Sequence, residues 1–180
     1  LDVRQRSLTR YIENRSRWIA SRGAQLPSPQ ILELQESAQR SLDEAEAEED
    51  AAFRAALKRL AETCDFIVID SPGGDSYLAR LAHSWADTLI TPLNDSFVDF
   101  DLLGDVDETC ADIVRPSIYS EMVWESRKKK ALAARTPIDW VVLRNRTATS
   151  KIEAKNKQRV GRSLSTLSSR IGFRLAPGLS

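Results

Sequence analysis

The chain has 180 residues, of which 42% are hydrophobic, and its 26 basic residues are balanced by 26 acidic ones. No apolar run approaches the roughly 20 residues that span a membrane, so we expect one soluble domain over residues 1–180. Because the formal net charge is zero, any contact with nucleic acid must depend on basic residues gathered locally.

The amino-terminal part begins in the middle of a pattern. The chain has no initiator Met, and residues 1–3 read as the tail of a strand, so we expect a fragment that is truncated at both ends. Residues 5–21 predict a helix, which stops at Gly23. Its apolar side chains share one helical stripe: Leu8, Tyr11, Ile12, Trp18 and Ile19.

Acidic residues crowd positions 43–50, just ahead of a predicted helix whose apolar face carries Phe53, Leu57, Leu60 and Cys64. Acids at the positive end of a helix dipole stabilise the first turn, which is the favoured interpretation. Metal binding is the alternative.

The central stretch is residues 66–76, Phe-Ile-Val-Ile-Asp-Ser-Pro-Gly-Gly-Asp-Ser. Its four apolar residues predict a buried strand that ends at Asp70, and neither a strand nor a helix continues through Pro72 and the glycines that follow. In an open parallel sheet, ligands gather beyond the carboxyl ends of the strands. Asp70 is therefore placed either to meet a phosphate-bound Mg²⁺ ion or to cap the next helix.

The remaining elements alternate between helices and strands. Predicted helices cover 77–85, 100–114, 117–130 and 151–170, and predicted strands cover 88–92, 139–145 and 172–175. Short connections between them favour right-handed parallel units. We therefore predict an α/β fold with a doubly wound, mostly parallel sheet and flanking helices.

Phosphate chemistry needs positioning and charge neutralisation. Asp70 could hold Mg²⁺, and the Gly73 amide could approach a terminal phosphate because no Cβ stands in the way. Loss of that phosphate would release residues 70–76, which makes them a candidate switch. The Asn145 amide suits a purine edge, or else caps a turn. No G-x-x-x-x-G-K-[ST] loop is present in these residues.

Cysteine and histidine usage points away from a metal site. Cys64 and Cys110 lack CxxC spacing and are expected to be reduced thiols in a cytoplasmic protein. His83, the only histidine, is expected on the helix after the central loop.

A basic helix is predicted near the carboxyl end. Lys155 and Arg159 share a helical face, while Lys157 is turned away from them. Phosphate contacts need basic side chains and no base-edge geometry, which fits DNA binding without sequence preference. A solvated surface is the alternative.

Several segments together resemble the ParA/MinD group of deviant P-loop ATPases, and within it the MipZ family of division-plane positioning ATPases. The Asp-Ser-Pro-Gly-Gly loop is shared by the whole group, whereas Asn-Asp-Ser-Phe-Val-Asp-Phe-Asp and Trp-Val-Val-Leu-Arg-Asn-Arg are similar to MipZ. The matching segments run nearly the full length: 1–7, 65–76, 91–101, 139–146 and 172–174.

The resemblance implies an ATP-hydrolysing enzyme that uses Mg²⁺. Asp2 would help to orient the attacking water, and Asp70 would be the Walker B acid for Mg²⁺. Pro72 and Gly73 would sense the γ-phosphate, and Asn145 would read adenine. The family's upstream strand and deviant Walker A loop are missing before Asp2, and its carboxyl-terminal helices after Ser180, so we expect the 180 residues alone to be inactive.

The resemblance also implies partners. The family forms a homodimer with ATP at the interface, binds double-stranded DNA non-specifically through a basic helix at 155–159, and contacts a ParB-type partition protein. It also inhibits assembly of FtsZ, and so places the division site from the nucleoid without a membrane. The alternatives are a generic ParA-type chromosome or plasmid partition ATPase, or a non-enzymatic scaffold or DNA-binding relic if the native chain starts at Leu1.

Overall fold

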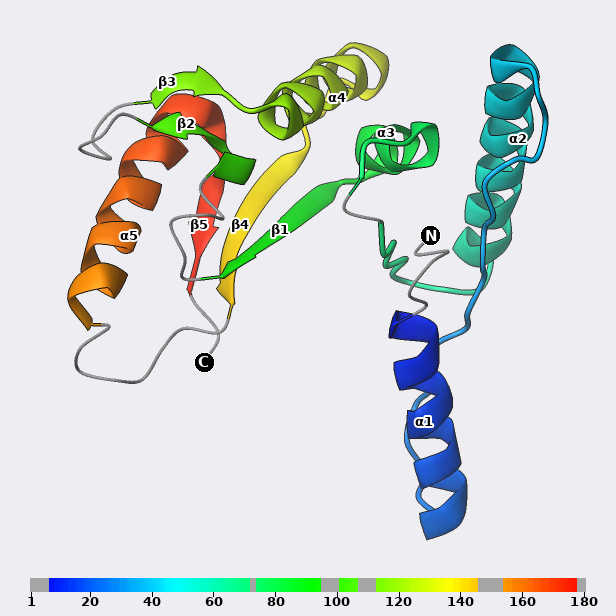
Figure 1. Cartoon of the computed structure of the whole chain (residues 1–180). Coiled ribbons are helices and arrows are strands. Elements are labelled where there is room, and N and C mark those ends of the chain that lie inside the picture. The colour runs from blue at the N-terminus through cyan, green and yellow to red at the C-terminus, as the bar shows by residue number, and fades with distance from the viewer. Residues whose placement is uncertain (1–6, 72–73, 95–100, 107–112, 146–153, 178–180) are drawn as a thin grey trace. The chain divides into compact units, whose positions relative to one another are not determined.

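The computed structural model describes residues 7–71, 74–94, 101–106, 113–145 and 154–177 (Figure 1). The chain divides into two compact units, Leu1–Ala82 and His83–Ser180. Each unit has its own cluster of buried side chains, and each is described by itself. No described helix is both long enough and apolar enough to cross a membrane.

The first unit is helical. It contains α1 (Ser7–Arg22), α2 (Leu42–Ala61) and most of α3 (Tyr77–Trp85). Gly23 follows α1 with φ +61, a left-handed conformation that glycine adopts without steric cost, so the predicted helix and its stop are confirmed. The predicted stripe is only partly buried, because Ile12 is buried while Tyr11 and Trp18 are exposed.

Helix α2 begins at Leu42, so the acidic run lies within the helix and not ahead of it. Two of these acids make tertiary contacts. The buried carboxylate of Glu49 accepts a hydrogen bond from the Ser37 backbone N–H at 2.9 Å, and Glu48 accepts one from the Ser37 hydroxyl. These acids hold the preceding segment against α2. No group of three metal-ligating side chains occurs among the described residues.

The predicted strand at 66–69 is wrong in this structure. These residues form no helix or strand, and the side chains of Phe66 and Val68 are 89% and 83% exposed. Ile69 alone packs against the cluster that contains Phe53, Leu78 and Ala82. Apolar, β-favouring side chains make a strand only where a second strand pairs with them, and no described segment pairs with this one.

The second unit is built on a parallel sheet in the order β1-β4-β5 (Figure 1). Its strands are β1 (Thr88–Asn94), β4 (Asp139–Asn145) and β5 (Arg174–Ala176). Helices α4 (Ile118–Ala134) and α5 (Ala154–Leu167) connect and flank them, which confirms the predicted α/β class. Side chains of β1 alternate between buried and exposed, so this strand is covered on one face only.

A polar network lies inside the core of this unit. The buried Trp140 indole donates from Nε1 to the Thr91 hydroxyl at 3.0 Å, and that oxygen lies 2.6 Å from the Tyr119 hydroxyl. The Trp140 ring meets Phe173 edge to face, with ring centroids 5.4 Å apart. Burial raises the pKa of Tyr119, although its hydrogen bond with Thr91 works in the opposite direction.

The predicted helix at 100–114 is wrong. Its described residues contain β2 (Gly104–Val106) and β3 (Ile113–Pro116), which pair antiparallel. Leu103 is completely buried, and its carbonyl accepts hydrogen bonds from the Ser117 N–H and the Ser120 hydroxyl. Leu103 is therefore a buried anchor beside a short antiparallel strand pair, and the apolar residues of this segment do not form a helical stripe.

Helix α4 begins at the expected place and runs beyond residue 130. Ser117 caps its amino end by accepting from the Ser120 N–H at 3.0 Å, and Arg135 ends it in a left-handed conformation. The basic run 127–130 therefore lies a turn inside the helix. After α5, a π-helical turn over Ser168–Gly172 leads to Phe173 and β5.

Lys130 of α4 caps a different helix. Its ammonium group donates to the carbonyls of Trp85 and Ala86, at 3.2 and 2.7 Å, and to the Asp87 carboxylate at 2.6 Å. The Lys130 side chain is only 10% exposed. All three of its N–H groups thus have partners at the carboxyl end of α3, where a positive charge also complements the helix dipole.

We expect Lys130→Met to lower the free energy of unfolding by about 2 kcal/mol, because three charged hydrogen bonds at the carboxyl end of α3 are lost. Urea unfolding followed by circular dichroism measures the change. The control is Lys129→Met, which removes the same charge from an exposed neighbour and should change stability by less than about 0.5 kcal/mol. Equal effects of the two variants would contradict the capping role.

His83 of α3 is buried. Its imidazole meets the ring of Tyr119 edge to face, with ring centroids 6.0 Å apart. Its Nδ1 atom is buried and has no hydrogen-bond partner among the described residues. Burial lowers the pKa of His83 because the charged form is poorly solvated there.

Stability should therefore fall as the pH is lowered. The pKa of His83 is lower in the folded chain than in the unfolded chain, so the unfolded chain binds more protons below a pH of about 6.5. The stabilisation is complete above that pH and is lost toward the folded pKa, with a slope of at most about 1.4 kcal/mol per pH unit. Urea unfolding at pH 7.5 and 5.5 tests this.

His83→Phe should flatten the change between those two pH values, since no other histidine is present. A variant that kept the full pH dependence would show that other groups cause it.

Candidate functional site

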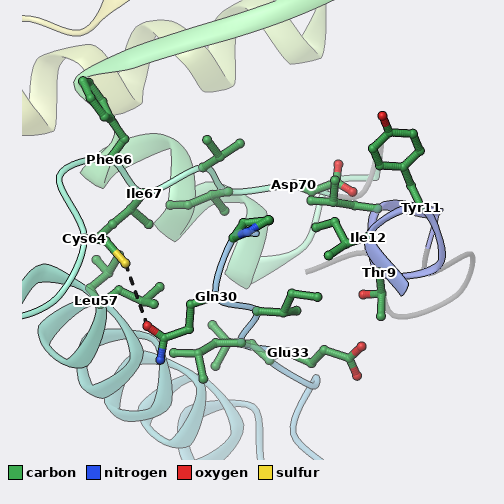
Figure 2. Close-up of a pocket in the computed structure, with 18 of the residues that line it drawn as sticks. Thr9, Tyr11, Ile12, Gln30, Glu33, Leu57, Cys64, Phe66, Ile67 and Asp70 are labelled. Carbon is green, nitrogen blue, oxygen red and sulfur yellow. Dashed lines mark hydrogen bonds between the residues drawn. The ribbon is translucent and has the colours of Figure 1, made fainter. Parts of the chain in front are cut away.

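Asp70 lies at the end of the extended segment that follows α2. Its side chain is half-buried and forms part of the wall of a cavity of about 680 Å³ within the first unit (Figure 2). The wall brings together α1, the segment 27–35, α2 and residues 66–70. Its labelled members include Thr9, Tyr11, Ile12, Gln30, Glu33, Leu57, Cys64, Phe66 and Ile67.

Most of the cavity wall is apolar, and its polar groups are few. Arg15 donates to the carbonyl of Pro27 at 3.3 Å, which ties α1 to the segment 27–35. The Thr63 hydroxyl donates to the Gln30 side chain at 3.2 Å, and the Cys64 thiol lies 3.9 Å from the same oxygen. Cys64 is a half-buried free thiol, in agreement with the prediction; Cys110 lies outside the described residues.

The exit from the central loop is held by α3. Ser76 accepts from the Ala79 N–H through its hydroxyl at 3.2 Å, which caps the first turn. Asp75 accepts from Nε and Nη2 of Arg80, both at 2.6 Å. This hydrogen-bonded pair lowers the pKa of the Asp75 carboxyl group. Asp75 is therefore engaged with the helix, whereas Asp70 and Glu33 are the acids on the cavity wall.

Asn145 occupies the last position of β4 in the second unit, where it is half-buried. In the parallel register it is paired with Asn94, the last residue of β1. Both amides therefore stand at the carboxyl edge of the sheet, the edge where ligands of α/β proteins bind. Asn94 was not predicted as a site residue. Its position at the end of a strand, ahead of Asp95, was the available signal.

The structure describes only some of the other predicted site residues. Asp2, Pro72 and Gly73 lie outside the described residues. Lys155, Lys157 and Arg159 lie on helix α5, as expected for a basic helix, and their side chains are outside the described set.

Arg144 adds a cation beside this helix. A Cβ atom on Gly161 of α5 would come within 3.3 Å of the Arg144 Nη1 atom, so the glycine leaves room for the guanidinium. Gly161 follows Lys157 by four residues and so lies on the same side of α5. Arg144 was not singled out from the sequence, although it precedes Asn145 directly.

The donor set fits magnesium in a limited way. The cavity wall offers the carboxylates of Asp70 and Glu33. Mg²⁺ keeps several of its waters and is held by one or two carboxylates together with substrate phosphates. Two carboxylates, of which Asp70 is half-buried and Glu33 is exposed, suit a nucleotide-bound Mg²⁺ better than a free structural ion. A site of three or more metal-ligating side chains is not found in the described ranges.

A search of curated proteins returned no match. A family model described as "ATPase MipZ" matches residues 1–180, the whole of the sequence. That span includes both the Asp70 loop and the sheet edge at Asn145, and on this evidence the chain belongs to the MipZ family of ATPases.

Proposed function

We propose that the protein is an ATP-dependent dimerisation switch that places the division site by inhibiting FtsZ assembly. The observation that carries this proposal is the match of the MipZ ATPase family over residues 1–180. ATP would join two subunits with the nucleotide at their interface, and hydrolysis would separate them. The switch then acts only where the ATP-bound dimer accumulates.

Within this proposal, Asp70 holds Mg²⁺ through its carboxylate, and its position on the cavity wall supports that role. When bound, the ion neutralises phosphate charge. Pro72 and Gly73 sense the terminal phosphate, and Asp2 orients the attacking water. Asn145, with Asn94 beside it in register, reads the adenine edge.

Non-specific DNA binding would keep the dimer on the nucleoid in the cytoplasm, and a ParB-type partition protein would load it there. Lys155, Lys157 and Arg159 are the proposed phosphate contacts on α5. Two described cations support this assignment. Arg162 is exposed three residues after Arg159, and Arg144 lies beside Gly161 on the Lys157 side of the helix.

The full-length protein with ATP should suppress FtsZ polymerisation, followed by light scattering and sedimentation. Asp70→Asn should abolish that effect and lower ATP turnover by about a hundredfold or more, because a neutral amide holds Mg²⁺ poorly. Phosphate release measures the turnover.

Asp65→Asn is the matched control, since it removes a carboxylate from an exposed position five residues earlier. It should leave both readouts unchanged. Wild-type protein that hydrolyses ATP without affecting FtsZ would identify a partition ATPase instead, and protein that neither binds nor hydrolyses ATP would contradict the switch altogether.

Replacing Lys155 and Arg159 together by Ala should weaken binding to duplex DNA. It should also reduce the steepness of the plot of log K against log salt by roughly 1 to 2. With fewer phosphate contacts, binding releases fewer counterions. Fluorescence anisotropy at several salt concentrations measures both quantities.

Lys58 and Arg59, exposed on α2, provide a control with the same change in charge. Their double Ala variant should keep the wild-type slope. If the Lys155 and Arg159 variant also kept it, these residues would not belong to the DNA interface.

A further inference from the structure

Helix α4 presents a stripe of exposed side chains to solvent. Trp124, Lys128 and Leu132 follow one another at intervals of four residues, so they lie along one face of the helix. The Trp124 side chain is 50% exposed, and that of Leu132 is almost fully exposed. We call these three residues, with Arg127, the Trp124 stripe.

Two cations lie within contact range of the indole. The Arg127 Cζ atom and the Lys128 Nζ atom each lie 5.8 Å from the centroid of the Trp124 ring, within the range of a cation–π interaction. Arg127 is itself fixed, because its Nη1 donates to the Gly172 carbonyl at 2.7 Å. Lys128 is steadied by Glu125 at 2.7 Å. The aromatic surface and its positive flanks are thus set in place before any partner arrives.

The charge on the exposed surface of α4 is divided along the helix. Lys128 and the exposed Lys129 make the carboxyl-terminal half positive, whereas Glu121 and Glu125 occupy the exposed amino-terminal half. A nucleic-acid backbone that followed the helix would meet those carboxylates. A short acidic peptide can stay on the positive half, so the distribution of charge favours a peptide.

We propose that the Trp124 stripe docks an extended acidic peptide segment that carries one aromatic or large aliphatic residue. The apolar residue of the partner packs on the indole and on Leu132, and its carboxylates pair with Lys128 and Lys129. Half-exposed Trp beside Arg is the composition typical of binding hot spots. This inference goes beyond the proposed ATPase switch and does not depend on nucleotide.

The test uses the full chain labelled with ¹⁵N and the blocked peptide Asp-Glu-Phe-Glu-Asp. Proton–nitrogen spectra follow the indole signal of Trp124, which is assigned by its loss in Trp124→Phe. The signal should shift and saturate. The uncharged peptide Asn-Gln-Phe-Gln-Asn should bind more weakly by a factor of about ten or more, because it lacks the carboxylates. Trp124→Ala, followed through the backbone amide signals of α4 because the indole signal is gone, should weaken binding of the acidic peptide about fivefold or more.

Trp18→Ala is the matched control, since Trp18 on α1 is 52% exposed and its removal should leave the affinity unchanged. A second variant carries Lys128→Gln together with Lys129→Gln. It should weaken binding of the acidic peptide but not of the uncharged one. Because it leaves Trp124 in place, it tests the proposal even if Trp124→Ala lowers stability.

Three results would overturn the proposal. The first is equal affinity for the acidic and the uncharged peptide, and the second is unchanged affinity in both α4 variants. The third is displacement of the acidic peptide from Trp124 by duplex DNA at a concentration below that of the peptide. The last result would assign the stripe to phosphate.

Discussion

The indole of Trp140 is the contact on which the second unit depends. It donates to the Thr91 hydroxyl of β1, which is also hydrogen-bonded to the Tyr119 hydroxyl of α4. Its ring packs on Phe173, just before β5. A buried polar group without a partner costs about 1–3 kcal/mol, so these groups must find one another in the folded chain. A slip of β1 by one residue would turn Thr91 to the exposed face and leave the indole N–H without its acceptor.

The same constraint reaches the candidate site. Because Thr91 is paired with Val142 in register, Asn94 and Asn145 three residues later finish their strands side by side. Parallel strands of equal length thus carry two amides to one edge of the sheet. In the first unit, Asp70 is held differently, by the packing of Ile69 below it and by the capped start of α3 beyond the loop. The acid and the amides are therefore positioned by independent parts of the fold.

Periodicity and β-branched runs were enough to predict α1, α3, β1, β4 and β5 and the α/β class. They failed where a segment depends on a neighbour. Residues 66–70 have the composition of a strand but lack a pairing partner in the described structure. The acids at 43–50 lie within α2, where Glu48 and Glu49 bind the distant Ser37. The position of Asp70 at the end of its segment was readable from the sequence, whereas the cavity around it was not, since distant segments build its wall. Leu103 illustrates the same limit, because only its burial distinguishes an anchor from part of a helix.

The capped end of α3 gives the chain a chemical reporter of its own motion. Amine reagents label a lysine only when its nitrogen is accessible, and the three hydrogen bonds of Lys130 must open before it can react. Lys128 and Lys129 stand exposed on the same helix and react without any opening. The ratio of label at Lys130 to label at its neighbours therefore measures how often α4 separates from the end of α3, within one molecule and with its own internal standard.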